Sequence, residues 1–293
     1  MKPQTSAYAH GLAAVLLWST VATAFKLALR HLTPPLLLLY ATATSTAVLL
    51  GMLAARGQAR LLLRGSPGDY LRSALLGLLN PFLYYLVLFW AYDLLPAQQA
   101  QPLNYTWAIT LTLLSIPLLG QRPSARDLAA VVVSYLGVVI IATEGAPLSL
   151  RFQSPLGVAL ALGSTIIWAL YWIYNTRDRR DPVAALCLSF IFGLVYIVIA
   201  APWLGGLRLP DLAGLAGAVY IGVFEMGVTF VLWLKAMRLT RSTARVSNLI
   251  FISPFLSLVL IHLLLGETIR GSTVVGLIFI IGGIALQQLG APR

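Results

Sequence analysis

The second half of this 293-residue chain repeats the first half at a shift of 146 positions. Gly11 aligns with Gly157, and the Leu-Leu-Gly tract at 118–120 recurs at 264–266. Each copy contains five apolar stretches of the length that crosses a bilayer as a helix. Because five is an odd number, the second copy must enter the membrane from the opposite side. The sequence therefore predicts two inverted five-helix repeats, residues 1–146 and 147–293, an architecture typical of secondary transporters.

The composition excludes an ordinary soluble domain. Hydrophobic residues make up 59% of the chain and charged residues only 10%, against about 25% charged in typical soluble domains. The mean hydropathy is +0.87, and only short polar breaks separate the apolar runs. We therefore predict an all-α integral membrane protein that forms a single integrated unit. Its ten expected transmembrane helices cover residues 8–29, 35–55, 73–92, 96–118, 126–143, 154–175, 183–204, 212–235, 243–265 and 271–289.

The distribution of Lys and Arg predicts the orientation of these helices. Most basic residues fall in the loops that would share a side with the two termini. Only Arg30, Arg151, Arg208 and Arg270 fall in the loops on the other side. Since basic loops stay in the cytoplasm, both termini are expected there. The net charge of +11 is then explained by topology, and no nucleic-acid partner is expected.

Three ionisable residues inside the predicted spans are candidates for function, because charges within a bilayer are costly. Glu225 lies about 20 Å from the outer end of its helix, near the midplane. It is either a carboxylate that binds an amine or carries a proton, or a protonated or hydrogen-bonded structural carboxyl between helices. Lys26 is close to a span end, where snorkelling or a structural pairing is favoured. His262 is expected to be a hydrogen-bonded packing residue.

Aromatic and amide side chains recur on single helical faces. In the sixth span Ser164, Trp168 and Trp172 are spaced by four residues, which places them on one side of a helix. Such faces inside a bundle suit an aromatic or apolar ligand, with amides and hydroxyls to hold a zwitterion. Ordinary packing is the alternative. The candidate substrate-binding residues are Trp18, Asn80, Tyr84, Gln101, Tyr105, Trp107, Ser164, Trp168, Trp172, Glu225 and Asn248.

Other aromatic residues lie near the predicted span ends. Trp90, Tyr92, Trp203 and Trp233 fit the belt that aromatic side chains form at membrane–water interfaces. We therefore expect these four side chains to face the interface rather than the interior of the bundle.

Two segments carry a resemblance to a known family. The first is Leu-Leu-Trp-Ser-Thr at 16–20, and the second is Leu-Asn-Tyr-Thr-Trp at 103–107. Together with the ten spans and short loops, they resemble the drug/metabolite transporter superfamily, in its EamA branch, and especially its bacterial aromatic amino-acid exporters. The eighth and ninth spans look like generic EamA members instead.

The resemblance implies a function as well as a fold. Four helices of each half would surround a central cavity, with the fifth and tenth helices outside it. The chain would export aromatic and other neutral amino acids across the bacterial inner membrane by alternating access. Its partners would be the small-molecule substrate and the lipid bilayer, and a monomer would suffice. Export of another small metabolite or a drug by the same fold is the alternative.

Motifs for other chemistry are absent from the sequence. There is no phosphate-binding loop for ATP, no serine nucleophile elbow, and no His, Cys and carboxylate spacing typical of a metal site. We therefore expect no cofactor, no metal and no catalytic residue. An intramembrane enzyme or a membrane scaffold is the remote alternative.

Overall fold

The computed structural model describes residues 3–120, 124–149, 152–240 and 248–288, and within these ranges the regular structure is entirely helical. Eight of the described helical stretches are long and apolar enough to cross a membrane. Two shorter apolar helices follow, Leu249–Leu265 and Gly271–Leu286. The chain is thus a multi-pass membrane protein. Eight predicted spans overlap the eight long stretches, and the last two overlap the shorter apolar helices. Residues 243–247 of the ninth predicted span lie outside the described ranges.

In the first half of the chain some spans are broken, so several of its helices have eleven residues or fewer. It consists of α1 (Pro3–Leu29), α2 (Pro34–Ala55), α3 (Pro67–Gly77), the π-helical turn η2 (Leu78–Leu83), α4 (Tyr84–Leu94), α5 (Ala97–Tyr105), α6 (Trp107–Leu119) and α7 (Ala125–Ala142).

The second half follows a similar order. It consists of α8 (Pro155–Asn175), α9 (Pro182–Ala200), α10 (Leu212–Tyr220), the π-helical turn η5 (Ile221–Val228), α11 (Thr229–Leu239), η6 (Asn248–Ile252), α13 (Ser253–Leu260), the π-helical turn η7 (Ile261–Leu265) and α14 (Gly271–Gln288).

The third span begins six residues earlier than the sequence predicts, at Pro67 rather than at residue 73. Ser66 and Asp69 form a capping box. The Asp69 N–H donates to Ser66 Oγ at 3.2 Å, and the Ser66 N–H donates to Asp69 Oδ2 at 2.9 Å. These bonds satisfy backbone donors that a helix start leaves free. The polar first turn is therefore helical, and hydropathy alone misses it.

The third and eighth spans each contain a π-helical turn near the middle, η2 and η5. Asn80 has non-helical backbone angles (φ −144°, ψ 116°) next to Pro81, whose ring removes a backbone donor. In the eighth span η5 widens the helix around Glu225, and the Thr229 hydroxyl donates to the Phe224 carbonyl within this region. Such π-helical turns rotate the following residues relative to a regular helix.

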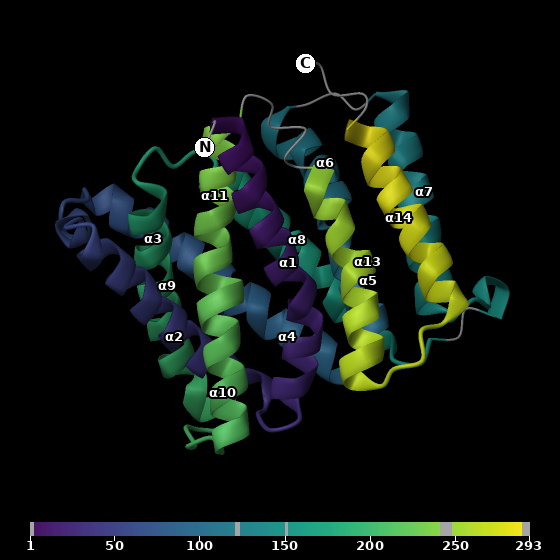
Figure 1. The fold of residues 1–293 in the computed structure, drawn as a ribbon, viewed down its shortest axis with the longest axis horizontal. Helices are drawn as coiled ribbons and strands as arrows, with labels where there is room; N and C mark the ends of the chain where they lie inside the picture. Colours follow the sequence, from purple (N-terminus) through teal and green to yellow (C-terminus); the bar gives the residue numbers. More distant parts are fainter. Residues whose placement is uncertain (1–2, 121–123, 150–151, 241–247, 289–293) are drawn as a thin grey trace.

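Helices α7 and α14 pack side by side at one edge of the bundle (Figure 1). A Cβ atom on Gly137 would lie 2.4 Å from the carbonyl oxygen of Gly276, so the two backbones meet directly. Ser134 Oγ also donates to the carbonyl of Ile280 at 3.3 Å. Ser134 and Ile280 are separated by 146 positions, so they occupy equivalent places in the two copies of the repeat.

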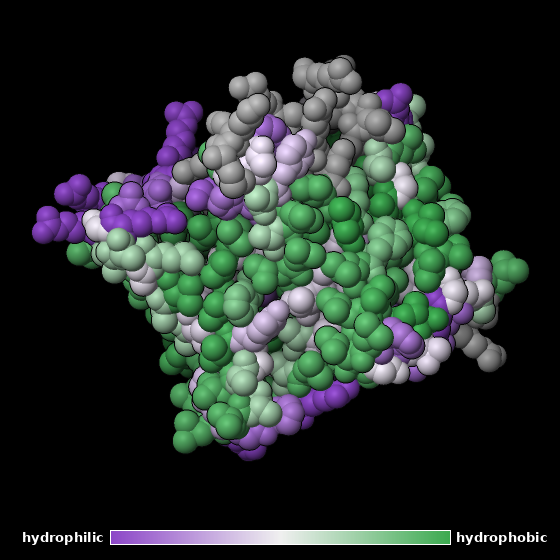
Figure 2. All heavy atoms as spheres, viewed as in Figure 1, coloured by the Kyte–Doolittle hydropathy of each residue, from purple (hydrophilic) through white to green (hydrophobic). Residues whose placement is uncertain are grey.

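Helix α1 begins and α14 ends at the same end of the bundle, which is uppermost in Figure 1. We call this the terminal end and the other the opposite end. Figure 2 shows a broad apolar band across the face in view, with hydrophilic residues gathered toward the two ends. Large apolar side chains such as Leu156 and Ile199 are exposed on the outside of the fold. Such a surface suits contact with lipid rather than water.

Candidate functional site

A cavity of about 520 Å³ lies inside the bundle. Its wall is built from both halves of the chain, chiefly by α1, α4, α5 and α6 from the first half and by α8, η5 and α11 from the second. Its volume is within the range of about 300–1,000 Å³ that small-molecule sites occupy.

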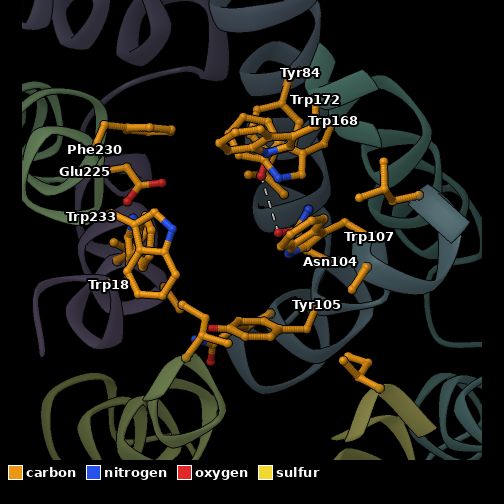
Figure 3. A pocket seen from close by; sticks show the side chains of 18 of the residues that line it. Trp18, Tyr84, Asn104, Tyr105, Trp107, Trp168, Trp172, Glu225, Phe230 and Trp233 are labelled. Atoms are coloured by element: carbon orange, nitrogen blue, oxygen red, sulfur yellow. Dashed lines mark hydrogen bonds between the residues drawn. The ribbon is translucent and has the colours of Figure 1, made fainter. Parts of the chain in front are cut away.

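Eight of the eleven predicted site residues lie on this wall (Figure 3). They are Trp18, Tyr84, Gln101, Tyr105, Trp107, Trp168, Trp172 and Glu225. Asn80 and Ser164 do not line the cavity, and both are fully buried. The side chain of Asn248 lies outside the part of the chain that the structure describes.

Ser164 is kept out of the cavity lining by its hydrogen bonds. Its Oγ donates to the Ala161 carbonyl at 2.7 Å and accepts a hydrogen bond from Asn104 Nδ2 at 3.0 Å. Ser164 therefore lies behind Asn104 and holds that amide in place. Asn80 is buried at the break between α3 and α4, where the backbone turns its side chain into the protein.

The cavity also contains aromatic residues that the sequence does not assign to it. Tyr92 and Trp233 were expected in the interfacial belt, yet both line the cavity. Phe25 and Phe230 line it as well. Trp203 lies outside the cavity wall and is 80% exposed. The belt expectation for Trp233 rests only on its position near a span end, and nearness to a span end does not determine which way a side chain points.

One wall of the cavity is a stack of rings from both halves. The Tyr84 ring on α4 stacks on the Trp168 ring on α8, with centroids 4.4 Å apart and planes at 26°. Trp172 meets Trp168 edge-on at 5.8 Å. These offset and edge-on arrangements are the favourable geometries for aromatic pairs.

The facing wall carries a second aromatic group. Trp18 lies 5.2 Å from Trp233 and 6.2 Å from Phe230, measured between ring centroids. Phe230 in turn reaches Trp168 at 6.0 Å. Figure 3 shows the two groups on opposite sides of an open space, with Tyr105 and Trp107 completing the ring of side chains. A flat aromatic ligand would find apolar faces on several sides.

Glu225 supplies the one carboxyl group among the described residues that line the cavity. Its Oε1 accepts a hydrogen bond from the Tyr85 hydroxyl at 3.2 Å, and the Trp18 indole N–H is a second donor to the carboxyl group. Figure 3 shows the carboxylate directed toward the open space, close to Phe230 and Trp233. Among the described residues that line the cavity, Glu225 is the only formally charged one.

Neutral polar groups lie on the other side of the site. The Tyr84 hydroxyl donates to Asn104 Oδ1 at 3.4 Å, and Gln101 Oε1 is buried without a partner among the described residues. The indole nitrogen of Trp172 is also buried and has no hydrogen-bond partner in the described part of the chain. Buried polar groups without partners are costly, so a ligand that bonds to them is favoured.

The cavity reaches toward the terminal end of the bundle. Its wall includes Leu119 at the end of α6, Thr176 just after α8 and Ile284 near the end of α14. At the opposite end, side chains join neighbouring backbone segments. Lys26 Nζ donates to the carbonyls of Tyr92 and Leu95 at 2.7 and 3.1 Å. Lys26 is thus held in the structural pairing expected of it.

A second group closes the opposite end by joining the two halves. Glu267 accepts hydrogen bonds from the N–H groups of Ala97 and Gln98, at 2.8 and 3.2 Å. This carboxylate therefore caps the start of α5, where backbone donors are free and negative charge is stabilised. Gln98 Nε2 donates to the Thr268 carbonyl at 3.0 Å, and Gln98 Oε1 accepts from the Arg270 N–H at 2.9 Å.

Further polar contacts surround this closure. His262 lies outside the cavity wall, and its Nδ1 is 2.9 Å from the Glu267 carbonyl, as expected of a hydrogen-bonded packing residue. Where α10 starts, the Gly214 N–H donates to Asp211 at 2.7 Å, and His31 contacts the same carboxylate. The Gly214 bond, followed by the His31 contact, lowers the pKa of Asp211 below its ordinary value.

Removing the Glu267 carboxylate is expected to loosen the opposite end. Hydrogen bonds to charged groups contribute about 1.5–3 kcal/mol each, so losing two should raise the open population at least about tenfold. The measurement uses Gln101→Cys in a Cys187→Ser background, since Cys187 is the single native cysteine. A membrane-impermeant thiol reagent applied from the predicted outer side should react faster when Glu267→Ala is added. Equal reaction rates with and without Glu267→Ala would contradict this role.

Comparison with known proteins shows to which family the chain belongs. The sequence profile of the EamA-like transporter family matches residues 5–143 and again residues 155–287. The chain belongs to this family. The EamA family lies within the drug/metabolite transporter superfamily, which the sequence motifs resemble. Members of the EamA family are named transporters and exporters rather than enzymes.

Individual EamA relatives differ in what is known of them. An uncharacterised transporter of Clostridium kluyveri is 29% identical over 76% of this chain and 73% of its own length. The aromatic amino acid exporter YddG of Ancylobacter novellus is 27% identical over 99% of both chains. A solved crystal structure with 24% identity shares the fold, with a TM-score of 0.65 over 97% of both chains.

Proposed function

We propose that this EamA-family transporter exports aromatic and other neutral amino acids across the bacterial inner membrane by alternating access. The observation that carries the proposal is the cavity wall, in which aromatic rings from both halves face a single carboxylate and a few neutral polar groups. The relative from A. novellus that is similar over 99% of this chain is named an aromatic amino acid exporter, which supports the same substrate class.

The proposed moving parts are the two halves of the chain, residues 1–146 and 147–293. The two separate matches to the family profile support this division, and the cavity lies between elements of both halves. An inverted pair of this kind transports by rocking about a site near the midplane. One chain holds both halves, so we propose that a monomer is the working unit.

Each part of a neutral aromatic amino acid has a counterpart in the cavity. The ring would lie between the Trp168 stack and the Trp18 group, which are on facing walls. The ammonium would approach Glu225, and the carboxylate would accept hydrogen bonds from Asn104 and from indole N–H groups. The cavity would load from the terminal end, which we propose faces the cytoplasm. Release would require the contacts of Glu267 and Gln98 to separate.

The driving force follows from charge. A zwitterion carries no net charge, whereas a unit charge moved across 100 mV changes the energy by about 2.3 kcal/mol. Uniport down a concentration gradient is therefore sufficient for export. Proton antiport would need a titrating group, and Glu225 is the best placed one. An exporter of another small metabolite or drug is the alternative with the same fold.

Counterflow in proteoliposomes tests the proposal. Purified protein is reconstituted in vesicles loaded with unlabelled phenylalanine, and uptake of radiolabelled phenylalanine is measured against protein-free vesicles. Tryptophan, tyrosine and phenylalanine are expected to compete with the label, whereas lysine, glutamate and glucose are not. An absence of phenylalanine flux, with flux of another compound of the panel, would favour the alternative cargo.

The variant Glu225→Gln separates uniport from proton antiport. Any stimulation of phenylalanine exchange by an imposed pH gradient is expected to disappear in this variant, because Glu225 is the only formally charged residue among the described cavity lining. Initial rates are measured with and without the gradient for both proteins. If Glu225→Gln retains the full dependence on the gradient, Glu225 is not the proton carrier.

A further inference from the structure

The described cavity wall offers a charged partner for only one of the two charged groups of an α-amino acid. A neutral amino acid brings one positive and one negative group, whereas the described wall offers Glu225 and no Lys, Arg or His. Lys26 is held away from the ligand, since its ammonium bonds to the carbonyls of Tyr92 and Leu95. The site therefore has a charged partner for the ammonium of a ligand and only neutral partners for its carboxylate.

The Glu225 carboxylate has unused capacity for a cation. An ionised carboxylate offers about four acceptor positions, whereas Glu225 meets two hydrogen-bond donors among the described residues, the Tyr85 hydroxyl at 3.2 Å and the Trp18 indole N–H. A buried charge without a charged partner is unfavourable, and an ammonium would remove that penalty. The faces of Trp18, Phe230 and Trp233 nearby would add cation–π attraction.

The partners for a ligand carboxylate are weaker. Asn104 already uses one of its amide hydrogens on Ser164 and accepts a bond from Tyr84. The remaining donors are neutral amide and indole N–H groups, and bonds without a charged donor are roughly half as strong as charge-assisted ones. Taking a carboxylate out of water with such partners gives little net gain.

We infer that this transporter recognises its ligand by the aromatic ring and the ammonium, and that it carries aromatic primary amines without a carboxylate as well as amino acids. This inference rests on the proposed function, because it concerns the same cavity and the same ring-binding wall. The inference redefines the substrate class of the transporter. Compounds of the 2-phenylethylamine type are included in that class, and aromatic acids without an amine are excluded from it.

Three ligands that share the ring and differ only in charge test the inference. Purified full-length protein in detergent is titrated with phenylalanine, 2-phenylethylamine and 3-phenylpropionate, and the Kd is measured by calorimetry. The amine is expected to bind at least as tightly as phenylalanine. The acid is expected to bind at least about tenfold more weakly than the amine, because it leaves Glu225 unpaired and lacks a charged partner.

The variant Glu225→Gln tests whether the Glu225 carboxylate causes the difference in affinity between the amine and the acid. It is expected to weaken binding of 2-phenylethylamine at least about tenfold and to leave 3-phenylpropionate unchanged or tighter. Asp93→Asn is the matched control, since Asp93 is an exposed carboxylate outside the cavity wall, and it should alter neither Kd. If Glu225→Gln does not fold, the comparison of the three ligands on the unmodified protein still decides.

The outcomes separate this inference from the proposed function. If phenylalanine binds and 2-phenylethylamine binds more than tenfold more weakly than phenylalanine, the inference is overturned and the proposed function stays intact. Equal binding of the amine and the acid would also overturn it. If none of the three ligands binds, both the inference and the proposed aromatic amino-acid site are wrong.

Discussion

Replacing Trp168 by alanine is expected to reduce the initial rate of phenylalanine counterflow at least about tenfold, because it removes the ring that organises the aromatic wall. Trp168 stacks on Tyr84 at 4.4 Å and also contacts Trp172 and Phe230. The Trp168 side chain is only 8% exposed, so its removal leaves a space in the wall. The ring of phenylalanine would then lack a complementary surface to pack against. The rate is measured per folded protein, as judged by size-exclusion chromatography.

A second cavity residue separates binding from stability. Truncating a buried aromatic residue to alanine costs about 3–5 kcal/mol of folding free energy, so Trp168→Ala alone is ambiguous. Trp107 is only partly buried, and Trp107→Ala should therefore reduce transport with less loss of stability. Trp203→Ala, at a side chain that is 80% exposed, is the control and should transport normally. Normal rates in both cavity variants would remove the aromatic site from the proposal.

Adding one methyl group at Gly137 is expected to lower the melting temperature of the protein markedly. The new Cβ would lie 2.4 Å from the Gly276 carbonyl oxygen and 2.9 Å from Phe279 Cβ. The carbonyl oxygen belongs to the backbone, so it cannot move aside by a change of side-chain rotamer. Helices α7 and α14 would have to separate, which forfeits packing along their contact. Overpacking of this kind costs about 1–3 kcal/mol or more. Thermal unfolding in detergent, followed by tryptophan fluorescence, measures the effect.

The same substitution at Gly282 provides a matched control in the same helix pair. A Cβ atom on Gly282 has no neighbouring atom within 4 Å, so Gly282→Ala meets open space. Alanine is favoured over glycine in a helix by about 1 kcal/mol, and this variant should melt at or above the temperature of the unmodified protein. Equal melting of the Gly137 and Gly282 variants would show that close backbone contact does not stabilise the pair.

Hydropathy and turn residues predict where the helices lie. Every predicted span coincides with a helix or a broken helix in the described residues. The start of α3 is missed because Ser66 and Asp69 stabilise a polar first turn, which a hydropathy pattern does not register. The hydropathy pattern does not show the breaks at Asn80 and around Glu225, since the apolar run continues through both. Pro81, which follows Asn80, is the sequence signal for the first break.

The sequence also predicts part of the site, because helical periodicity shows which residues share a face of a helix. Periodicity predicts that Trp168 and Trp172 share a face, and both line the cavity. Periodicity cannot tell an inner polar position from a buried one, so Ser164 is assigned to the wall although Asn104 stands in front of it. Nearness to a span end predicts that Tyr92 and Trp233 lie at the membrane interface, whereas both side chains line the cavity.

The sequence by itself determines that this is a helical multi-pass membrane protein of the EamA family, because the length and order of apolar runs and the family motifs are local properties of the chain. The repeat even predicts which residues are equivalent, such as Ser134 and Ile280. Only the tertiary structure decides that these two meet across α7 and α14. It alone places Glu225 opposite a wall without a described cation. Helix rotation and the contacts between distant segments decide these features, and no local pattern contains them.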